Sequence, residues 1–153
     1  MREEIVDIER ELMLIGRHSA MATLRARQHE GRLERSTYIL LRRLEAEGPM
    51  SIGQLAQAFG LDTSTVNRQT AVLLRSGLAE RIPDPDGGMA RKLRITAEGL
   101  RHMRQECALI LDGLATVLAD WTPAELASFA EGLAHFNASI GAPKDCRPAD
   151  QSG

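Results

Sequence analysis

The sequence predicts a mainly α fold, in the α+β sense that it carries one small β-hairpin. Apolar residues recur every three or four positions through most of the chain, which is typical of helices with one buried face. Aromatic residues make up only 3% of the sequence, so aliphatic side chains on packed helices must supply most of the core. With 153 residues, we expect one domain spanning 1–153.

A long helix is predicted first, over residues 4–28. Its apolar stripe is too wide to be covered by one neighbouring helix, and is formed by Ile5, Ile8, Leu12 and Ile15 with a second edge at Val6, Met13, Ala20 and Leu24. Either this helix crosses the middle of the domain, or it buries one face internally and the other against a second subunit. We favour the second interpretation and assign residues 5–28 to a dimer interface.

Three shorter helices are predicted next, near 33–47, 52–59 and 62–76. Each is bounded by a residue type that starts or stops helices. These boundaries are Gly48-Pro49, the capping-box pair Ser51 and Gln54, Gly60, Asp62 or Thr63, and Gly77. The last two helices are separated by a short turn, as in a helix-turn-helix.

A hairpin and two long helices complete the chain. Strands are predicted at 78–83 and 91–95, on either side of a turn rich in Gly, Pro and Asp. Thr96 is expected to cap a helix to about residue 119, and Thr122 and Glu125 to begin the last one, so we assign 97–140 to dimerisation. The polar segment 141–153 is expected to be a flexible tail.

The order of elements over 33–96 is that of a winged helix-turn-helix. In this arrangement the second helix of the pair, here 62–76, is placed in the major groove of double-stranded DNA. The whole chain has a net charge of −2, which excludes a generally basic DNA binder. Residues 51–96 nevertheless carry six basic and four acidic side chains, so any DNA affinity must come from this local surface.

The predicted recognition helix has one apolar and one polar face. At 100° per residue, Val66, Thr70, Leu73 and Leu74 point to the core. The candidate DNA-contacting residues on the rest of the helix are Thr63, Ser64, Thr65, Asn67, Arg68, Gln69 and Arg75. Arg68 can donate two hydrogen bonds to guanine, Asn67 or Gln69 can pair with adenine or a phosphate, and the helix N-terminus suits a phosphate. An ordinary surface helix would have the same pattern, but the helix before it and the hairpin after it favour DNA recognition.

The segment resembles the multiple-antibiotic-resistance regulator (MarR) family. The resemblance is carried by a Leu-Ala pair, a Ser-Thr-Val-Asn-Arg recognition core, a Gly-Leu pair and an Ile-Thr-Ala-Glu-Gly exit, at 55–56, 64–68, 77–78 and 95–99. It implies a homodimer that binds a pseudo-palindromic operator, represses transcription and responds to a small-molecule effector. It also implies phosphate contacts from Ser36 and Ser51, and an effector crevice near His18 and Tyr38.

The wing departs from the family pattern. Met89 stands where the family usually has an arginine that enters the minor groove, and methionine cannot donate to the A·T acceptors there. Two alternatives follow. Arg91, beside Lys92, can replace the missing arginine, or the wing contributes little to DNA affinity. The second alternative is compatible with a winged-helix module that binds a protein partner and has weak or lost DNA binding.

The remaining features of the sequence indicate neither catalysis nor metal binding. The sequence has no nucleophile elbow, phosphate-binding glycine loop or dinucleotide fingerprint, so we expect no enzyme, no catalytic residue and no cofactor. Cys107 is expected in the core and Cys146 in the tail, while His102 and Glu106 suit a solvated pair better than a metal site. With no apolar run long enough to span a membrane and no signal peptide, a cytoplasmic protein without a membrane partner is expected.

Overall fold

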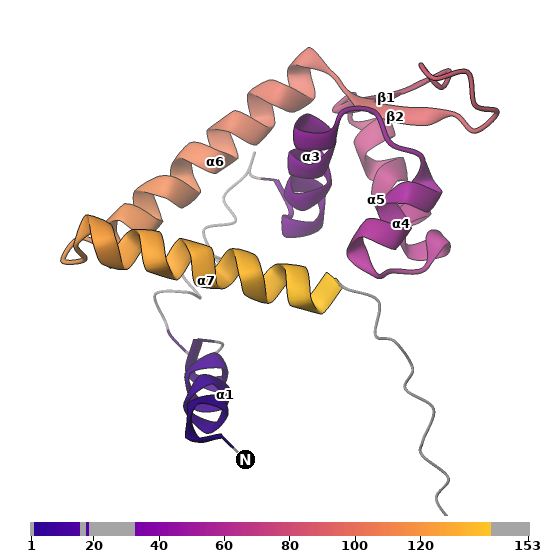
Figure 1. Cartoon of the computed structure of the whole chain (residues 1–153). Coiled ribbons are helices and arrows are strands. Elements are labelled where there is room, and N and C mark those ends of the chain that lie inside the picture. The colour runs from indigo at the N-terminus through magenta and orange to yellow at the C-terminus, as the bar shows by residue number, and fades with distance from the viewer. Residues whose placement is uncertain (1, 16–17, 19–32, 142–153) are drawn as a thin grey trace, which may run out of the picture.

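The computed structural model describes residues 2–15, 18 and 33–141, and its elements follow the predicted order (Figure 1). The elements are α1 (Glu3–Ile15), α3 (Arg35–Glu47), α4 (Ile52–Phe59), α5 (Thr63–Arg75), β1 (Ala79–Ile82), β2 (Lys92–Ile95), α6 (Ala97–Val117) and α7 (Pro123–Gly141). A mainly α fold with one two-stranded antiparallel sheet confirms the predicted class. The predicted helix 4–28 is seen as far as Ile15, and its other positions, apart from His18, lie outside the described residues.

The core lies between the winged helix-turn-helix module and the first half of α6. α3 contacts α5, α6 and β2, while α4 packs on α5, so four helices and the sheet share one aliphatic interior. Its buried members are Leu40, Leu41, Leu44, Leu55, Ala56, Val66, Leu73, Leu78, Ala79, Leu93 and Met103. Each fully buried leucine contributes roughly 1.5–3 kcal/mol, so this cluster is the main source of the module's stability.

The predicted helix boundaries are largely confirmed by their caps. The Ser51 hydroxyl accepts from the Gln54 backbone N–H at 3.1 Å, and the Gln54 side chain accepts from the Ser51 N–H at 2.9 Å, which completes the capping box. Gly60 ends α4 with a φ of +62°, a conformation that residues with a Cβ rarely adopt. Asp62, and not Thr63, caps α5.

The hairpin is shorter than predicted. Ala79 pairs with Ile95 and Ile82 with Lys92, and an isolated bridge between Met50 and Leu93 joins β2 to the loop before α4. Leu78, predicted to begin the first strand, instead packs in the core just before it. The wing is therefore held at its base by the helical module.

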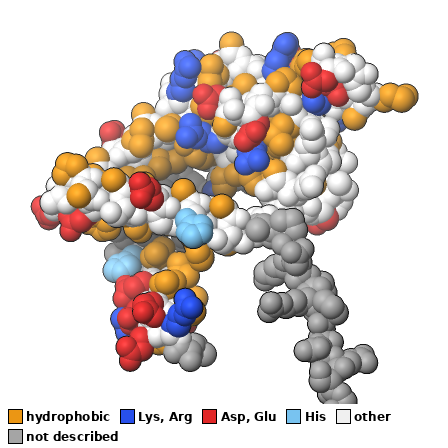
Figure 2. All heavy atoms as spheres, in the orientation of Figure 1, with side chains coloured by type: hydrophobic (Ala, Val, Ile, Leu, Met, Phe, Trp, Pro, Cys, Tyr) orange, Lys and Arg blue, Asp and Glu red, His pale blue; other side chains and the backbone are white. Residues whose placement is uncertain are grey.

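The helices outside the module leave broad apolar faces in water. α6 runs away from the module, and α7 returns from its far end (Figure 1). No residue of α1 or α7 is buried. Among the exposed large apolar side chains of these helices are Ile5, Ile8, Leu12, Leu111, Leu114, Leu126, Phe129, Leu133, Phe136 and Ile140. Figure 2 shows apolar side chains along all three helices.

Candidate nucleic-acid interface

The two faces of α5 are as predicted from its sequence. Val66, Thr70 and Leu73 are buried against the module. The opposite face exposes Ser64, Asn67, Arg68, Arg75 and the first residue, Thr63, to solvent, while Thr65 and Gln69 are half-buried at its margins. A helix with small polar residues near its N-terminus and an arginine one turn on can approach base edges closely.

The start of α5 is organised by a single carboxylate. Asp62 Oδ1 accepts from the Ser64 hydroxyl at 2.5 Å and from the Thr65 backbone N–H at 2.7 Å. Its Oδ2 accepts from the Thr65 hydroxyl at 2.9 Å. The hydrogen bond from Ser64, followed by those from Thr65, lowers the pKa of Asp62 to about 2, so the carboxylate is ionised at neutral pH.

Arg68 is tied to the same group of residues. Its Nη2 donates to the Thr65 hydroxyl oxygen at 3.3 Å, so a chain of hydrogen bonds runs from Arg68 through Thr65 to Asp62. The sequence identified each of these residues as a cap or a contact. It did not indicate that they form one network, because Asp62 and Thr63 are both suitable caps by residue type and only the structure shows which of them accepts these hydrogen bonds.

The other helical candidates lie around this surface. Ser51 is half-buried and its hydroxyl already accepts the capping bond from Gln54. Ser36 lies half-buried in the first turn of α3, and Arg75 is exposed in the last turn of α5. Phosphate contacts from these three residues stay predictions.

The wing is folded around Asp84. Its Oδ1 accepts from the Asp86 backbone N–H at 2.9 Å and lies 3.3 Å from Lys92 Nζ, and both interactions lower the pKa of Asp84. The side chain of Lys92 is only 13% exposed, and its ammonium lies between Asp84 and, at 3.9 Å, Asp86. A Cβ at position 88 would collide with the Asp84 carboxylate, so a side chain there would displace the carboxylate from its present position.

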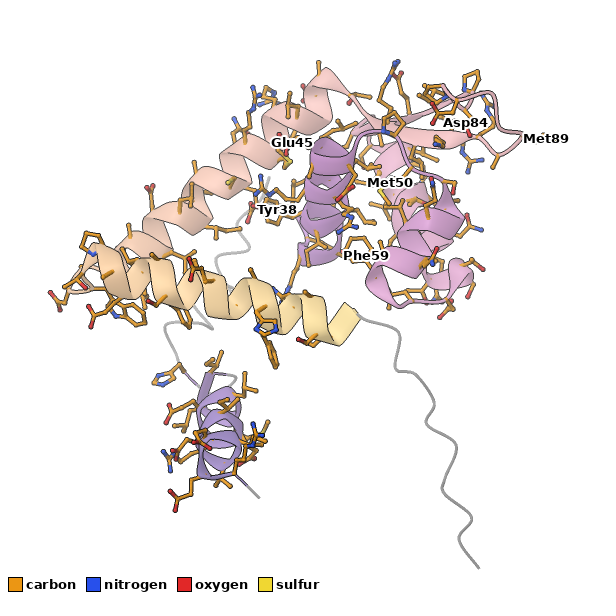
Figure 3. The ribbon with its side chains drawn as sticks, viewed as in Figure 1. Tyr38, Glu45, Met50, Phe59, Asp84 and Met89 are labelled. Carbon is orange, nitrogen blue, oxygen red and sulfur yellow. The ribbon has the colours of Figure 1, made fainter. Side chains whose placement is uncertain are left out.

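This ion pair changes the interpretation of the wing's basic residues. Lys92, a candidate DNA contact, is directed at the wing's own carboxylates in this structure, while Arg91 is exposed. Met89 is fully exposed and projects from the tip of the wing (Figure 3). The sequence did not predict the pairing of Lys92, because it depends on how the loop from 84 to 91 folds.

Tyr38, a predicted effector residue, contacts α6. Burial, followed by an interaction with the Cys107 side chain, raises the pKa of Tyr38. Both residues are half-buried between α3 and α6, so Cys107 is a partly accessible thiol and not a fully buried core residue. His18, the other predicted effector residue, is exposed.

The predicted pairing of His102 with Glu106 is wrong. His102 Nε2 lies 3.0 Å from Glu98 Oε1, in the preceding turn. Glu98 is exposed, also binds Arg101, and has its pKa lowered to about 2 chiefly by that hydrogen bond. Glu106 is instead buried, close enough to Tyr38 for its charge to raise the pKa of the phenol.

The described residues show neither a metal site nor a membrane-spanning helix. Residues 2–15, 18 and 33–141 contain no group of three or more His, Cys, Asp or Glu side chains suited to a metal ion. Among the helices in these ranges, none is both long and apolar enough to span a bilayer.

Comparison with known proteins agrees with this geometry. The sequence profile of the MarR family matches residues 33–88. The helix-turn-helix-type transcriptional regulator YxaD of Bacillus subtilis (strain 168) is 36% identical over 107 residues, which cover 70% of this chain and 75% of that protein.

Solved structures share the fold over most of their length. A MarR family protein from Bacillus stearothermophilus superposes with a TM-score of 0.72 at 20% identity, covering 93% of this chain and 99% of that one. The transcriptional regulator BldR from Sulfolobus solfataricus gives 0.73 at 19% identity, with 92% and 100% covered. PcaV from Streptomyces coelicolor, solved with its natural ligand, gives 0.62 at 26% identity, with 87% and 91% covered. The chain therefore belongs to the MarR family of winged helix-turn-helix transcriptional regulators.

Proposed function

We propose that this regulator is a homodimeric repressor that binds a pseudo-palindromic operator, with α5 of each subunit in the major groove. The exposed polar face of α5 is the observation that carries the proposal. It presents Ser64, Asn67 and Arg68 to solvent, while its other face completes the core of the module. The helix can therefore enter a groove without any rearrangement of the protein.

The exposed apolar faces outside the module support a dimer. Phe129, Leu133 and Phe136 on α7 are each more than 40% exposed, as are most apolar residues of α1. Apolar surface of this extent on a monomer marks an interaction site. A second copy of the chain, related by two-fold symmetry, would bury this apolar surface. The same symmetry would present the two copies of α5 to the two half-sites of the operator.

The position of Tyr38 supports effector control of the same regulator. Tyr38 lies between α3 of the module and Cys107 of α6, so a small molecule bound near Tyr38 would act between the DNA-binding module and a dimer helix. The related PcaV has been solved with its natural ligand. We propose a site for a small organic effector here, and release from DNA as its effect.

DNA binding is tested with the purified full chain and the DNA upstream of its own gene, titrated with salt beside random DNA of equal length. Selective binding, with log affinity falling linearly against log salt, is the expected result. Equal and weak binding to both DNAs would contradict the proposal. It would favour the alternative of a protein-interaction module whose wing, with Met89 at its tip, has lost DNA binding.

The dimer is tested by sedimentation of a Leu133→Glu variant. Burying a carboxylate in the apolar interface should shift the protein to monomers. Val72→Glu is the matched control, since Val72 is similarly exposed (39% against 46%) but lies on α5. Deletion of residues 1–28 should likewise give monomers or insoluble protein. A stable dimer in both Leu133→Glu and the deletion variant would refute this interface.

A further inference from the structure

The hydroxyl groups at the start of α5 have a fixed hydrogen-bonding direction. An ionised carboxylate carries no hydrogen and can only accept, so both hydroxyls bonded to Asp62 are donors in those bonds. A serine or threonine hydroxyl has a single hydrogen. The hydroxyl hydrogens of Ser64 and Thr65 are therefore both directed at Asp62, and the hydroxyl oxygens lie 2.5 and 2.9 Å from the carboxylate oxygens that accept them.

With both hydrogens committed to Asp62, the hydroxyl oxygens of Ser64 and Thr65 can only accept a hydrogen bond from an incoming ligand, through their lone pairs. Thr65 Oγ1 already accepts from Arg68, and Thr65 is half-buried. Ser64 is exposed, and no described hydrogen bond among residues 33–141 is accepted by its hydroxyl oxygen. Ser64 thus presents an acceptor on the face of α5 that enters DNA under the proposed function.

The bases differ in whether they can donate a hydrogen bond to the Ser64 oxygen. In the major groove, cytosine N4 and adenine N6 are amino donors, whereas guanine N7 and O6 and thymine O4 are acceptors. Phosphate oxygens are acceptors as well, so Ser64 in this state does not suit the phosphate contact expected from the sequence. A keto group facing Ser64 would leave two acceptors opposed.

We propose that Asp62 is a specificity-determining residue that acts through Ser64, and makes the start of the recognition helix select an amino-bearing base, cytosine or adenine. This inference rests on the proposed function, because it assumes that α5 lies in the major groove. Asp62 itself need not touch DNA. Its role is to orient the serine hydrogen away from the groove.

The decisive variant is Asp62→Gly, because glycine is tolerated at a helix N-cap with only a small loss of helix stability. Glycine removes the oxygen to which Ser64 donates, which frees the serine hydrogen to point into the groove. Asparagine is unsuitable, because Oδ1 accepts from both Ser64 and the Thr65 N–H, so an asparagine oxygen that keeps the cap would also keep the bond from Ser64. Binding is measured by competition among operators that differ only at the base pairs under the start of α5. Thermal unfolding of each variant verifies that the fold is retained.

The unmodified protein should prefer an amino base at one position of each half-site by about 2- to 10-fold, the value of one net hydrogen bond. Asp62→Gly should abolish or invert this preference, and Ser64→Ala should abolish it. In the Ser64→Ala background, Asp62→Gly should have no further effect on base preference. An unchanged preference in Asp62→Gly would overturn the proposal, as would a shift that persists without the serine hydroxyl, since Asp62 would then contact the base directly.

A second variant controls for the loss of negative charge that accompanies any replacement of Asp62. Asp86→Asn, on the wing, removes an equal charge from a side chain that is 90% exposed. Asp62→Gly and Asp86→Asn should both bind all sequences somewhat more tightly, but only Asp62→Gly should change the base preference. If the unmodified protein binds no sequence selectively, the proposed function fails and this proposal fails with it. Selective binding without an amino-base preference would overturn this proposal alone.

Discussion

The hydroxyl of Thr96 donates a hydrogen bond of 2.7 Å to the backbone carbonyl oxygen of Gly77. The Thr96 hydroxyl oxygen also accepts from the Gly99 N–H at 3.0 Å and so caps α6, while the Thr96 N–H donates to the Leu78 carbonyl oxygen at 3.1 Å. One threonine therefore joins the end of the recognition helix to the beginning of α6. The geometry between the DNA-binding module and α6 depends on this junction.

Replacing Thr96 with valine should lower the free energy of unfolding by about 1–2 kcal/mol. Valine keeps the shape but removes both the cap and the donor to Gly77. Urea unfolding at one fixed protein concentration measures the change, with Thr96→Ser expected to restore most of the stability. Thr116→Val is the control, because the Thr116 hydroxyl bonds only to the Asp112 carbonyl within α6. Equal effects at positions 96 and 116 would contradict the assignment.

Gly99→Ala should destabilise the protein, although alanine in a helix is ordinarily favoured over glycine by roughly 0.5–1 kcal/mol. A Cβ at position 99 would collide with the Leu78 carbonyl and press on Ile95, so α6 would have to move away from Leu78 and β2. Gly53→Ala in α4 serves as the comparison, since its Cβ would meet only Ser51 Oγ at 3.9 Å. Thermal unfolding should show opposite signs for the two variants, and a stable Gly99→Ala protein would disprove the close approach.

Arg68→Ala should weaken operator binding by roughly 1–3 kcal/mol and relax specificity at one position of each half-site. Arg68 is exposed and held by Thr65 in the middle of the polar face of α5. Arg75→Ala is the contrasting variant, because an arginine in the last turn is better placed for phosphate. Its loss should weaken all sequences equally and reduce the salt slope by about 1. Equal loss on every sequence for Arg68→Ala would reassign Arg68 to a phosphate contact.

Met89→Arg should strengthen DNA binding and steepen its salt dependence, if the wing tip reaches the minor groove. Met89 is fully exposed, so its replacement leaves the fold intact. Arg91→Ala, measured in the same fluorescence titration, separates the two alternatives for the wing. A loss of about one unit of salt slope would show that Arg91 substitutes for the missing arginine. No change in either variant would show that the wing stays away from the DNA.

The pKa of Asp62 predicts a pH dependence of stability. The folded-state pKa of about 2 lies below the ordinary value of 3.8, so the unfolded chain binds a proton first as the pH falls. The contribution is complete above about pH 4 and is lost as the pH falls towards 2. The free energy of unfolding of Asp62→Asn should therefore fall less steeply across this window. Parallel curves for the two proteins would show that the Asp62 hydrogen bonds are absent in solution.

Local signals in the sequence were sufficient for most of the fold. Ser51 and Gln54 predicted a capping box from their spacing alone, and the period of Val66, Thr70 and Leu73 identified the buried face of α5. These features depend on residues within one or two turns of each other, where helix geometry fixes the distances. The same holds for the exposed face that carries Arg68.

Choices between competing partners could not be predicted in this way. His102 has a glutamate one turn before it and another one turn after it, and only packing shows that Glu106 is buried, which leaves Glu98 as the partner. The contact between Tyr38 and Cys107 joins helices far apart in the sequence. Such contacts depend on how whole elements dock, which no local pattern encodes.

The folding of the wing around Asp84 has a consequence for the thermodynamics of binding. The hydrogen bond to Asp86 and the ion pair with Lys92 already order the loop in the free protein. A loop that is ordered before it meets its target loses little conformational entropy on association. An Asp84→Ala wing would keep the cationic side chains of Arg91 and Lys92 yet become disordered in the free protein. Its deficit in affinity would then appear in calorimetry mainly as a less favourable entropy of binding.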